Sequence, residues 1–305
     1  MSATIEVNDL RKSYGAVEAV RGVSFEVAAG EVFCLLGPNG AGKTTVTEIL
    51  EGYRERGGGS VSVLGMDPAQ GPRELRERVG IVLQSCGVQA DLTVAELLEM
   101  YGRYHSRRRS IDELIELVEL TEKRDTRAKQ LSGGQRRRLD LALALVGDPD
   151  LVFLDEPTTG FDPAARRHAW STIRSLCDLG KTVFLTTHFM DEAQHLASRV
   201  AVMRAGEIVA SGPPDELGGR ELRPAEISFL VPSGLSLTDV SEVVGAGAQA
   251  RVENGRVLIC SHEGVRTTQR ITSWALQAGV ELEHFQVMQP SLEDVYLELT
   301  AEGQG

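Results

Sequence analysis

The sequence predicts an α/β fold, in which helices pack on a largely parallel sheet, followed by a small α+β domain of the ferredoxin-like type. Three observations support this prediction. Short apolar runs alternate with segments of helical periodicity through residue 218, a glycine-rich loop joins one apolar run to a helix, and the remaining chain follows the order strand, helix, hairpin, helix, strand. We therefore expect one domain over residues 1–218 and a second over residues 219–305.

The composition is that of a globular protein. The chain has 305 residues, of which 42% are hydrophobic, enough to build a core in each of two domains. Its formal net charge of −12 argues against a protein that coats nucleic acid. No run approaches the roughly 18 apolar residues needed to span a bilayer, and Glu6 and Asp9 lie where a signal segment would be apolar. We expect a cytoplasmic protein that reaches a membrane only through a partner.

Strands dominate the start of the first domain. A glycine-rich turn over residues 37–42 separates one of them from a helix over residues 43–51, and this arrangement is typical of a mononucleotide-binding unit. The strands expected from apolar runs and alternation are residues 5–10, 24–27, 32–36, 60–64 and 81–84.

The middle of the chain changes character. Residues from about 88 to 148 carry many charges at helical spacing, which predicts a helical subdomain with helices over residues 95–104 and 111–120. Strands return at residues 151–154 and 182–186, separated by a helix. The separating helix is expected over residues 164–179, and a hairpin over residues 199–210 turns at Ala205-Gly206.

Glycine and proline residues near position 218 mark the start of the second domain. Its Asn254-Gly255 pair lies between two alternating segments, which is a strong signal for a two-residue hairpin turn. The expected elements are strands over residues 226–231, 251–252, 257–260 and 281–287 and helices over residues 237–244, 264–278 and 291–299.

The turn after the third strand matches the complete phosphate-loop pattern. Its glycines let backbone N–H groups turn toward phosphate oxygens, Lys43 adds a positive charge, and the Thr44 hydroxyl can hold Mg²⁺. The helix that follows points its positive end at the same anion. We expect the phosphates of a nucleotide to contact Gly37, Pro38, Asn39, Gly40, Ala41, Gly42, Lys43, Thr44 and Thr45.

An apolar strand over residues 151–154 ends in two carboxylates, Asp155 and Glu156. A carboxylate at the end of a buried parallel strand lies beside the phosphate loop, where Asp155 can hold Mg²⁺. Glu156 would then face the γ-phosphate and accept a proton from the attacking water. Acidic strand ends are common, so this interpretation depends on the phosphate loop earlier in the chain.

Leu131-Ser132-Gly133-Gly134-Gln135 lies between these two motifs. Physically it is a capped helix start with exposed N–H groups that can bind an anion. It also resembles, without departure, the signature motif of the ABC (ATP-binding cassette) ATPases. That resemblance covers nearly the whole chain and implies an ABC-type nucleotide-binding domain whose cofactors are ATP and Mg²⁺. Ser132, Gly133, Gly134 and Gln135 would bind the nucleotide of a partner subunit.

The resemblance assigns roles to four further residues. Tyr14 resembles the aromatic residue that stacks on adenine, although a half-buried strand residue is the simpler alternative. Gln84 resembles the glutamine that contacts Mg²⁺ and the attacking water, and His188 resembles the switch histidine that binds the γ-phosphate. Asp162, expected among the nucleotide-binding residues, occupies the loop that contacts the dimer partner, but the preceding Gly160-Phe161 departs from the commoner Ala-Leu form of that loop.

The chain has one phosphate loop and one signature motif, so the resemblance implies a homodimer that binds two ATP molecules. It also implies an integral membrane permease as partner, contacted near Gln84 and residues 85–92, and a location on the cytoplasmic face of the membrane. The C-terminal residues 291–299 resemble those of the bacterial daunorubicin-resistance class of export ATPases, which implies export of a drug, antibiotic, lipid or related cargo.

Other functions remain open at this stage. One alternative is a soluble ABC ATPase that acts on ribosomes or DNA, although the chain lacks the tandem cassettes or long coiled coil of such proteins. The second domain could serve dimerisation or regulation. Arg136, Arg137 and Arg138 are basic, but the simplest role for them is to balance an acidic surface, and we expect no nucleic-acid partner.

Overall fold

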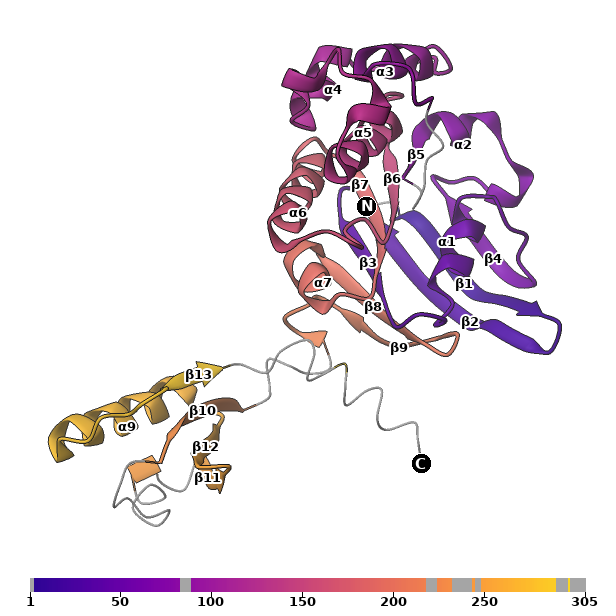
Figure 1. Ribbon diagram of the computed structural model, residues 1–305. Helices are drawn as coiled ribbons and strands as arrows, with labels where there is room; N and C mark the ends of the chain where they lie inside the picture. The colour runs from indigo at the N-terminus through magenta and orange to yellow at the C-terminus, as the bar shows by residue number, and fades with distance from the viewer. Residues whose placement is uncertain are drawn as a thin grey trace. The chain divides into compact units, whose positions relative to one another are not determined.

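The computed structural model describes residues 3–82, 89–217, 224–231, 243–244, 248–288 and 296 (Figure 1). The chain divides into two compact units, Met1–Pro214 and Asp215–Gly305. Within the described ranges, no helix is both long enough and apolar enough to cross a membrane.

A six-stranded sheet forms the centre of the first unit, and its strands follow the order β5-β6-β7-β3-β8-β9. All neighbouring strands are parallel except the edge pair β8–β9. Strands β3, β6 and β7 are almost entirely buried because helices or a second sheet cover both faces, and this explains their continuous apolar sequences. The strands are β3 (Val32–Leu36), β5 (Val79–Val82), β6 (Leu151–Asp155), β7 (Thr182–Thr187), β8 (Arg199–Arg204) and β9 (Glu207–Gly212).

A smaller antiparallel sheet, in the order β2-β1-β4, covers part of the first one. It contains β1 (Ala3–Tyr14), β2 (Val17–Ala28) and β4 (Gly58–Val63). The main core lies between the two sheets and helix α1 (Lys43–Leu50). Phe33 of β3 stacks against Phe25 of β2 and Phe184 of β7, with ring centroids 5.0 and 5.6 Å away. This packing holds β3, from whose other end the phosphate loop starts.

Helices α3 (Val94–Gly102), α4 (Ile111–Leu117) and α5 (Gly133–Leu145) gather at one end of the first unit (Figure 1). They enclose a core of their own, in which Leu97, Ile115 and Leu139 are buried. The other helices of this unit are α2 (Arg73–Arg78), α6 (Pro163–Asp178) and α7 (Met190–Leu196), with short 3₁₀ turns at Pro68–Gln70, Thr121–Lys123 and Ala128–Gln130.

The second unit contains an antiparallel sheet in the order β11-β12-β10-β13. This is the strand order of a ferredoxin-like β-α-β-β-α-β domain. Asn254 and Gly255 join β11 to β12 with positive φ angles of 49° and 77°, as the predicted hairpin turn requires. The elements are β10 (Ala225–Leu230), β11 (Ala248–Glu253), β12 (Arg256–Ser261), helix α9 (Gly264–Ala278) and β13 (Gln286–Met288). Ile271 of α9 packs on Phe229 and Ile259 of the sheet.

Several predicted elements differ from the structure. Strand β1 runs to Tyr14 rather than ending at residue 10, because its polar half pairs with β2 around a turn at Gly15. The strand expected over residues 281–287 begins only at Gln286, since His284 has a φ of 53° and lies in a turn. Most of the helix expected over residues 237–244, and the one over 291–299 apart from Tyr296, lie outside the described residues.

Candidate nucleotide-binding and hydrolysis site

The loop of residues 37–42 leaves β3 and enters α1 with little room around it. Gly37 donates its N–H to the Thr187 carbonyl at 3.1 Å, which ties the loop to β7. A Cβ on Gly37 would collide with the Met203 carbonyl, and one on Gly42, whose φ is 106°, would collide with the Ala19 carbonyl. Glycine is therefore required at both positions by the surrounding backbone. The loop is held in a fixed, tight conformation against β2, β7 and β8.

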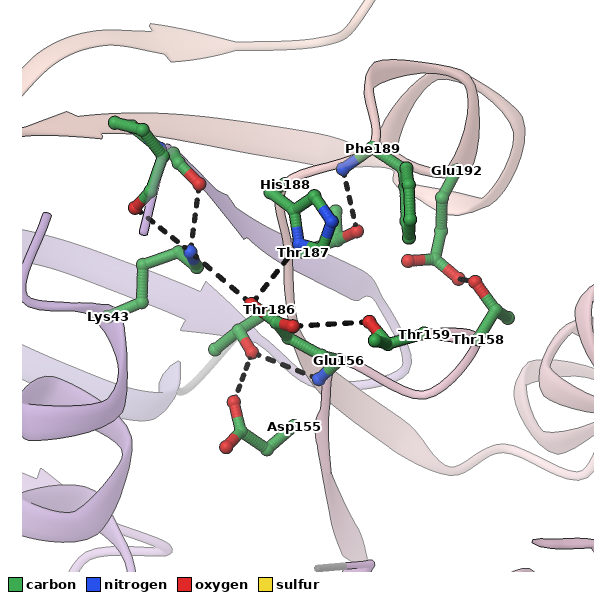
Figure 2. Close-up of polar contacts among 12 residues, drawn as sticks. Lys43, Asp155, Glu156, Thr158, Thr159, Thr186, Thr187, His188, Phe189 and Glu192 are labelled. Carbon is green, nitrogen blue, oxygen red and sulfur yellow. Dashed lines mark hydrogen bonds and ion pairs between the residues drawn. The ribbon is translucent and has the colours of Figure 1, made fainter. Parts of the chain in front are cut away.

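Lys43 extends back across this loop and is 5% exposed. Its Nζ donates to the carbonyl oxygens of Gly37 at 2.8 Å and Pro38 at 3.2 Å (Figure 2). Burial lowers the pKa of Lys43, and the negative charges of Glu156 and Asp155 partly offset that effect. Gly42 has no side chain to cap α1, so the N-terminal N–H groups of the helix remain available to an anion. Loop, ammonium and helix end together fit a phosphate group.

Glu156 lies at the centre of the site (Figure 2). Its Oε1 is 3.6 Å from Lys43 Nζ and 3.3 Å from His188 Nδ1, and its Oε2 accepts a hydrogen bond from the Thr159 hydroxyl at 3.1 Å. Glu156 has a φ of 46°, a backbone conformation that non-glycine residues adopt at an energetic cost and often at functional sites. Its N–H donates to the Thr186 carbonyl at 3.1 Å, which anchors this strained residue to β7.

The charges around Glu156 keep it ionised. Burial alone would raise the pKa of the Glu156 carboxyl, but the His188 ring, the Lys43 ammonium and the Thr159 hydroxyl hold it below its ordinary value. A carboxylate in this state can accept a proton from a water molecule held beside a phosphate. The electrostatics therefore agree with the role of proton acceptor expected for Glu156.

His188 follows β7 directly. The Thr187 hydroxyl accepts the Phe189 N–H at 3.0 Å, and the Phe189 ring packs on the His188 ring with centroids 4.0 Å apart. The distance from His188 Nδ1 to Glu156 suits an ion pair, and among the described residues this buried nitrogen has no hydrogen-bond partner. An unsatisfied buried nitrogen facing the site can receive a ligand.

Two of the predicted magnesium ligands can be compared with the structure. Asp155 accepts a hydrogen bond from the Thr186 hydroxyl at the end of β6, and Thr44 is exposed at the start of α1. In the part of the chain that the structure describes, no group of three or more His, Cys, Asp or Glu side chains is arranged so that it could hold a metal ion by itself. Mg²⁺ would therefore take ligands from phosphate and water in addition to the Thr44 hydroxyl and the Asp155 carboxylate. The third predicted ligand, Gln84, lies outside the described residues.

Tyr14, at the end of β1, is 40% exposed and its hydroxyl lies 3.4 Å from the Thr45 hydroxyl. The Arg54 guanidinium lies over the ring, 5.2 Å from its centroid. The Lys12 ammonium also lies over the ring, 5.6 Å from its centroid. Tyr14 is therefore beside the phosphate loop, with two cations against its ring. Its stacking on adenine stays a prediction.

Residues 132–135 form a self-contained helix start. The Ser132 hydroxyl accepts the Gln135 N–H at 3.3 Å, and the Gln135 side chain accepts the Ser132 N–H at 3.0 Å, so the two residues form a reciprocal capping box. Among the described residues, a Cβ on Gly133 or Gly134 would meet nothing within 4 Å, so this surface is open to them. Asp162 caps α6 in a similar way through the N–H groups of Ala164 and Ala165, each at 2.9 Å.

Sequence reasoning missed several residues that support the site. Arg137, expected only to balance surface charge, donates to the carbonyls of Asp155 and Pro157 at 3.4 Å. Thr186 holds both Asp155 and Glu156 through its hydroxyl. In the sequence, the only signal for Thr186 is its position two residues before the candidate histidine.

Comparison with known families identifies this arrangement. The ABC transporter family model matches residues 20–159, and the model for the C-terminal domain of ABC transporter domain-containing protein-like sequences matches residues 225–291. The Nod factor export ATP-binding protein I of Rhizobium meliloti (strain 1021) is 40% identical over 314 residues, which cover 98% of this chain and 88% of that protein. The chain belongs to the ATP-binding subunits of ABC transporters.

Solved structures of ABC ATP-binding proteins share the fold. The cbiO1 protein of Clostridium perfringens, described as part of the ABC transporter complex cbiONQ, superposes with a TM-score of 0.65 at 27% identity, over 71% of this chain and 90% of that one. MJ0796, an ATP-binding cassette described as a dimer bound to ADP and Pi, has a TM-score of 0.61 at 24% identity, over 68% of this chain and 98% of that one. The predicted fold class, an ABC-type nucleotide-binding domain with a small additional domain, is confirmed.

Proposed function

We propose that this ABC protein hydrolyses ATP and thereby drives an exporter in a membrane. The observation that carries the proposal is the 40% identity to an export ATP-binding protein across 98% of the chain, which includes the second unit as well as the cassette. A similarity limited to the cassette would not distinguish a transporter subunit from a soluble ABC ATPase. The position on the cytoplasmic face of the membrane is part of the same proposal.

The site residues have distinct proposed roles. Lys43 and the loop N–H groups bind the phosphates, and Asp155 with Thr44 would hold Mg²⁺, which neutralises phosphate charge when it is bound. Glu156 accepts a proton from the attacking water, and His188 keeps that carboxylate oriented and contacts the γ-phosphate. Gln84 is proposed as a further contact to the metal and the water.

We propose that a second copy of the chain completes the site. Within one chain, the side chains of Ser132 and Gln135 bond only to each other's backbone among the described residues, and Gly133 and Gly134 face open space. An exposed helix start with free N–H groups suits an anion held by another subunit. Two chains arranged head to tail would place residues 132–135 of each over the phosphates of the other, with Asp162 near the contact. ATP would then stabilise the dimer, and hydrolysis would release it.

The membrane partner is proposed to dock beside the helical subdomain. A cavity of about 340 Å³ lies between the core and this subdomain, lined by Glu51 and Tyr53 after α1, Gly80 of β5, Tyr101 of α3 and Asp140 of α5. Strand β5 ends two residues before Gln84, so a partner in this cavity could act on the nucleotide site. Residues 85–92 would add to the contact.

The class of cargo and the role of the second unit are further parts of the proposal. Similarity of the C-terminal residues to the daunorubicin-resistance class supports a drug, antibiotic, lipid or related cargo, whereas a relative is named for Nod factor export. The second unit is proposed to assist dimerisation or regulation. Truncation at Gly219 tests this role, because an unchanged dimer and ATPase rate would exclude both.

The decisive experiment is a pull-down of the tagged chain from gently solubilised native membranes, followed by mass spectrometry. The expected result is a polytopic membrane protein in near-equal amount, which is lost when Tyr101→Glu places a charge in the cavity. The exposed Glu113→Lys on α4 serves as the matched control and should leave recovery unchanged. Ribosomes, DNA-repair proteins or no membrane partner would instead indicate a soluble ABC ATPase.

A further inference from the structure

Glu192 of α7 is a completely buried acid that belongs to no motif in the sequence. Its Oε1 accepts hydrogen bonds from the Thr158 hydroxyl at 2.7 Å and from Trp170 Nε1 at 3.2 Å (Figure 2 shows the contact with Thr158). Burial raises the pKa of Glu192, and these two donors together with Thr187 and Arg166 counteract it. Burial of an acid carries a large desolvation cost, which its hydrogen bonds must offset, so the contacts of Glu192 constrain its position.

The two ends of the Thr158–Glu192 bond lie next to the reacting groups. Thr158 is two residues after Glu156, and the next residue, Thr159, donates its hydroxyl to the Glu156 carboxylate at 3.1 Å. Glu192 is four residues after His188. His188 and Glu156 are themselves 3.3 Å apart, so the contacts form a closed ring: Glu156 to Thr158 along the chain, Thr158 to Glu192, Glu192 to His188 along the chain, and His188 to Glu156.

The segment that carries His188 needs an external attachment. Helix α7 has only seven residues, and Phe189 at its start provides no side-chain cap. The Phe189 ring lies between the His188 ring, at 4.0 Å, and the Arg166 guanidinium, at 4.3 Å, but these are non-directional contacts. The short hydrogen bond from Thr158 joins α7 itself to the loop that carries Glu156, whereas the hydrogen bonds of the Glu156 N–H reach only Thr186 of β7.

We infer that Glu192 is a positioning residue, which through Thr158 holds the His188 segment in register with Glu156. This inference rests on the proposed function, in which Glu156 and His188 act on ATP. Loss of the Thr158–Glu192 bond leaves ATP binding at the phosphate loop intact but lets the two reacting groups separate. Misplacement of a catalytic group by about 1 Å can cost up to about a hundredfold in rate.

Trp170 provides a matched control, because it donates to the same oxygen of Glu192 but lies on α6 and does not link the two segments. ATPase assays on the full chain should show that Thr158→Val and Glu192→Ala lower kcat at least about tenfold with KM for ATP within about threefold. The double variant should be no slower than the worse single one. Glu192→Gln keeps an accepting oxygen and should restore kcat to within about threefold, whereas Trp170→Phe should stay within about twofold.

A second measurement does not depend on hydrolysis. In nucleotide-free protein labelled at its six histidines, the ring signal of His188, assigned with His188→Gln, should move in Thr158→Val and Glu192→Ala but not in Trp170→Phe. Equal effects of Thr158→Val and Trp170→Phe on both kcat and this signal would overturn the inference, because Glu192 would then only stabilise the fold. Absence of ATPase activity in the unchanged chain would refute the proposed function, while the histidine signal would still decide the positioning role.

Discussion

Glu51 provides the sharpest test of the electrostatics beside the site. This glutamate caps the C-terminus of α1 and lines the cavity between the core and the helical subdomain. Burial, with added repulsion from Asp155 and Glu48, raises the pKa of its carboxyl from 4.5 to about 8. Between these two values the folded protein keeps a proton that the unfolded chain has lost. The free energy of unfolding should therefore fall as the pH rises from about 4.5 to about 8, and level off above that range.

The size of the effect follows from the same values. A rise in pKa from 4.5 to about 8 has a ceiling of about 5 kcal/mol. Because Glu51 is only partly buried and water reaches the cavity, we expect about 2 kcal/mol. Glu51→Gln removes the ionisable group, so it should raise the free energy of unfolding by about 2 kcal/mol at pH 8.5 and by less than about 1 kcal/mol at pH 5.

Urea unfolding at the two pH values measures this difference. The protein has two tryptophans, so a Trp274→Phe background leaves the fluorescence of Trp170 to report on the first unit alone. Glu113→Gln, at an exposed position of α4, is the control and should follow the unchanged protein at both pH values. Parallel curves for Glu51→Gln and the unchanged protein would refute the account of Glu51.

Three further predictions concern the nucleotide site. Lys43→Ala should weaken ATP binding at least about tenfold, because it removes the buried ammonium that faces the phosphates; a fluorescent ATP analogue measures this, and unchanged affinity would contradict the role of Lys43. Gly42→Ala should lower the free energy of unfolding by about 3 kcal/mol through collision with Ala19, whereas Gly40→Ala, which has open space, should cost only about 1 kcal/mol; equal losses in urea unfolding would argue against a tight loop. Tyr14→Ala should weaken binding of ATP several-fold while Tyr14→Phe retains it, and equal loss in both variants would point to the hydroxyl rather than to ring stacking.

The sequence predicted the elements that local patterns determine. Strands β3, β6 and β7 are continuous apolar runs because they are buried on both faces, and the phosphate loop is recognisable because its glycines are required by the backbone. The Asn254-Gly255 turn has the conformation that its residues favour. The confirmed fold class follows from these local features.

Other features depend on contacts between distant parts of the chain. Arg11, Lys12 and Ser13 are polar, and only their pairing with β2 shows that β1 continues through them. The bond between Thr158 and Glu192 joins residues 34 positions apart, and no periodicity or motif indicates it. The positive φ of Glu156 is likewise imposed by its surroundings rather than by its residue type.

The central claim is that Glu156 activates water for ATP hydrolysis, at a site that a second chain completes. The Glu156→Gln variant tests this claim most directly. With Mg²⁺ and ATP, the variant should turn over at least about a hundredfold more slowly than the unchanged protein. It should also elute as a stable dimer in size-exclusion chromatography with light scattering, because ATP remains bound between the chains. Turnover close to that of the unchanged protein, or a variant that stays monomeric with ATP bound, would contradict the account.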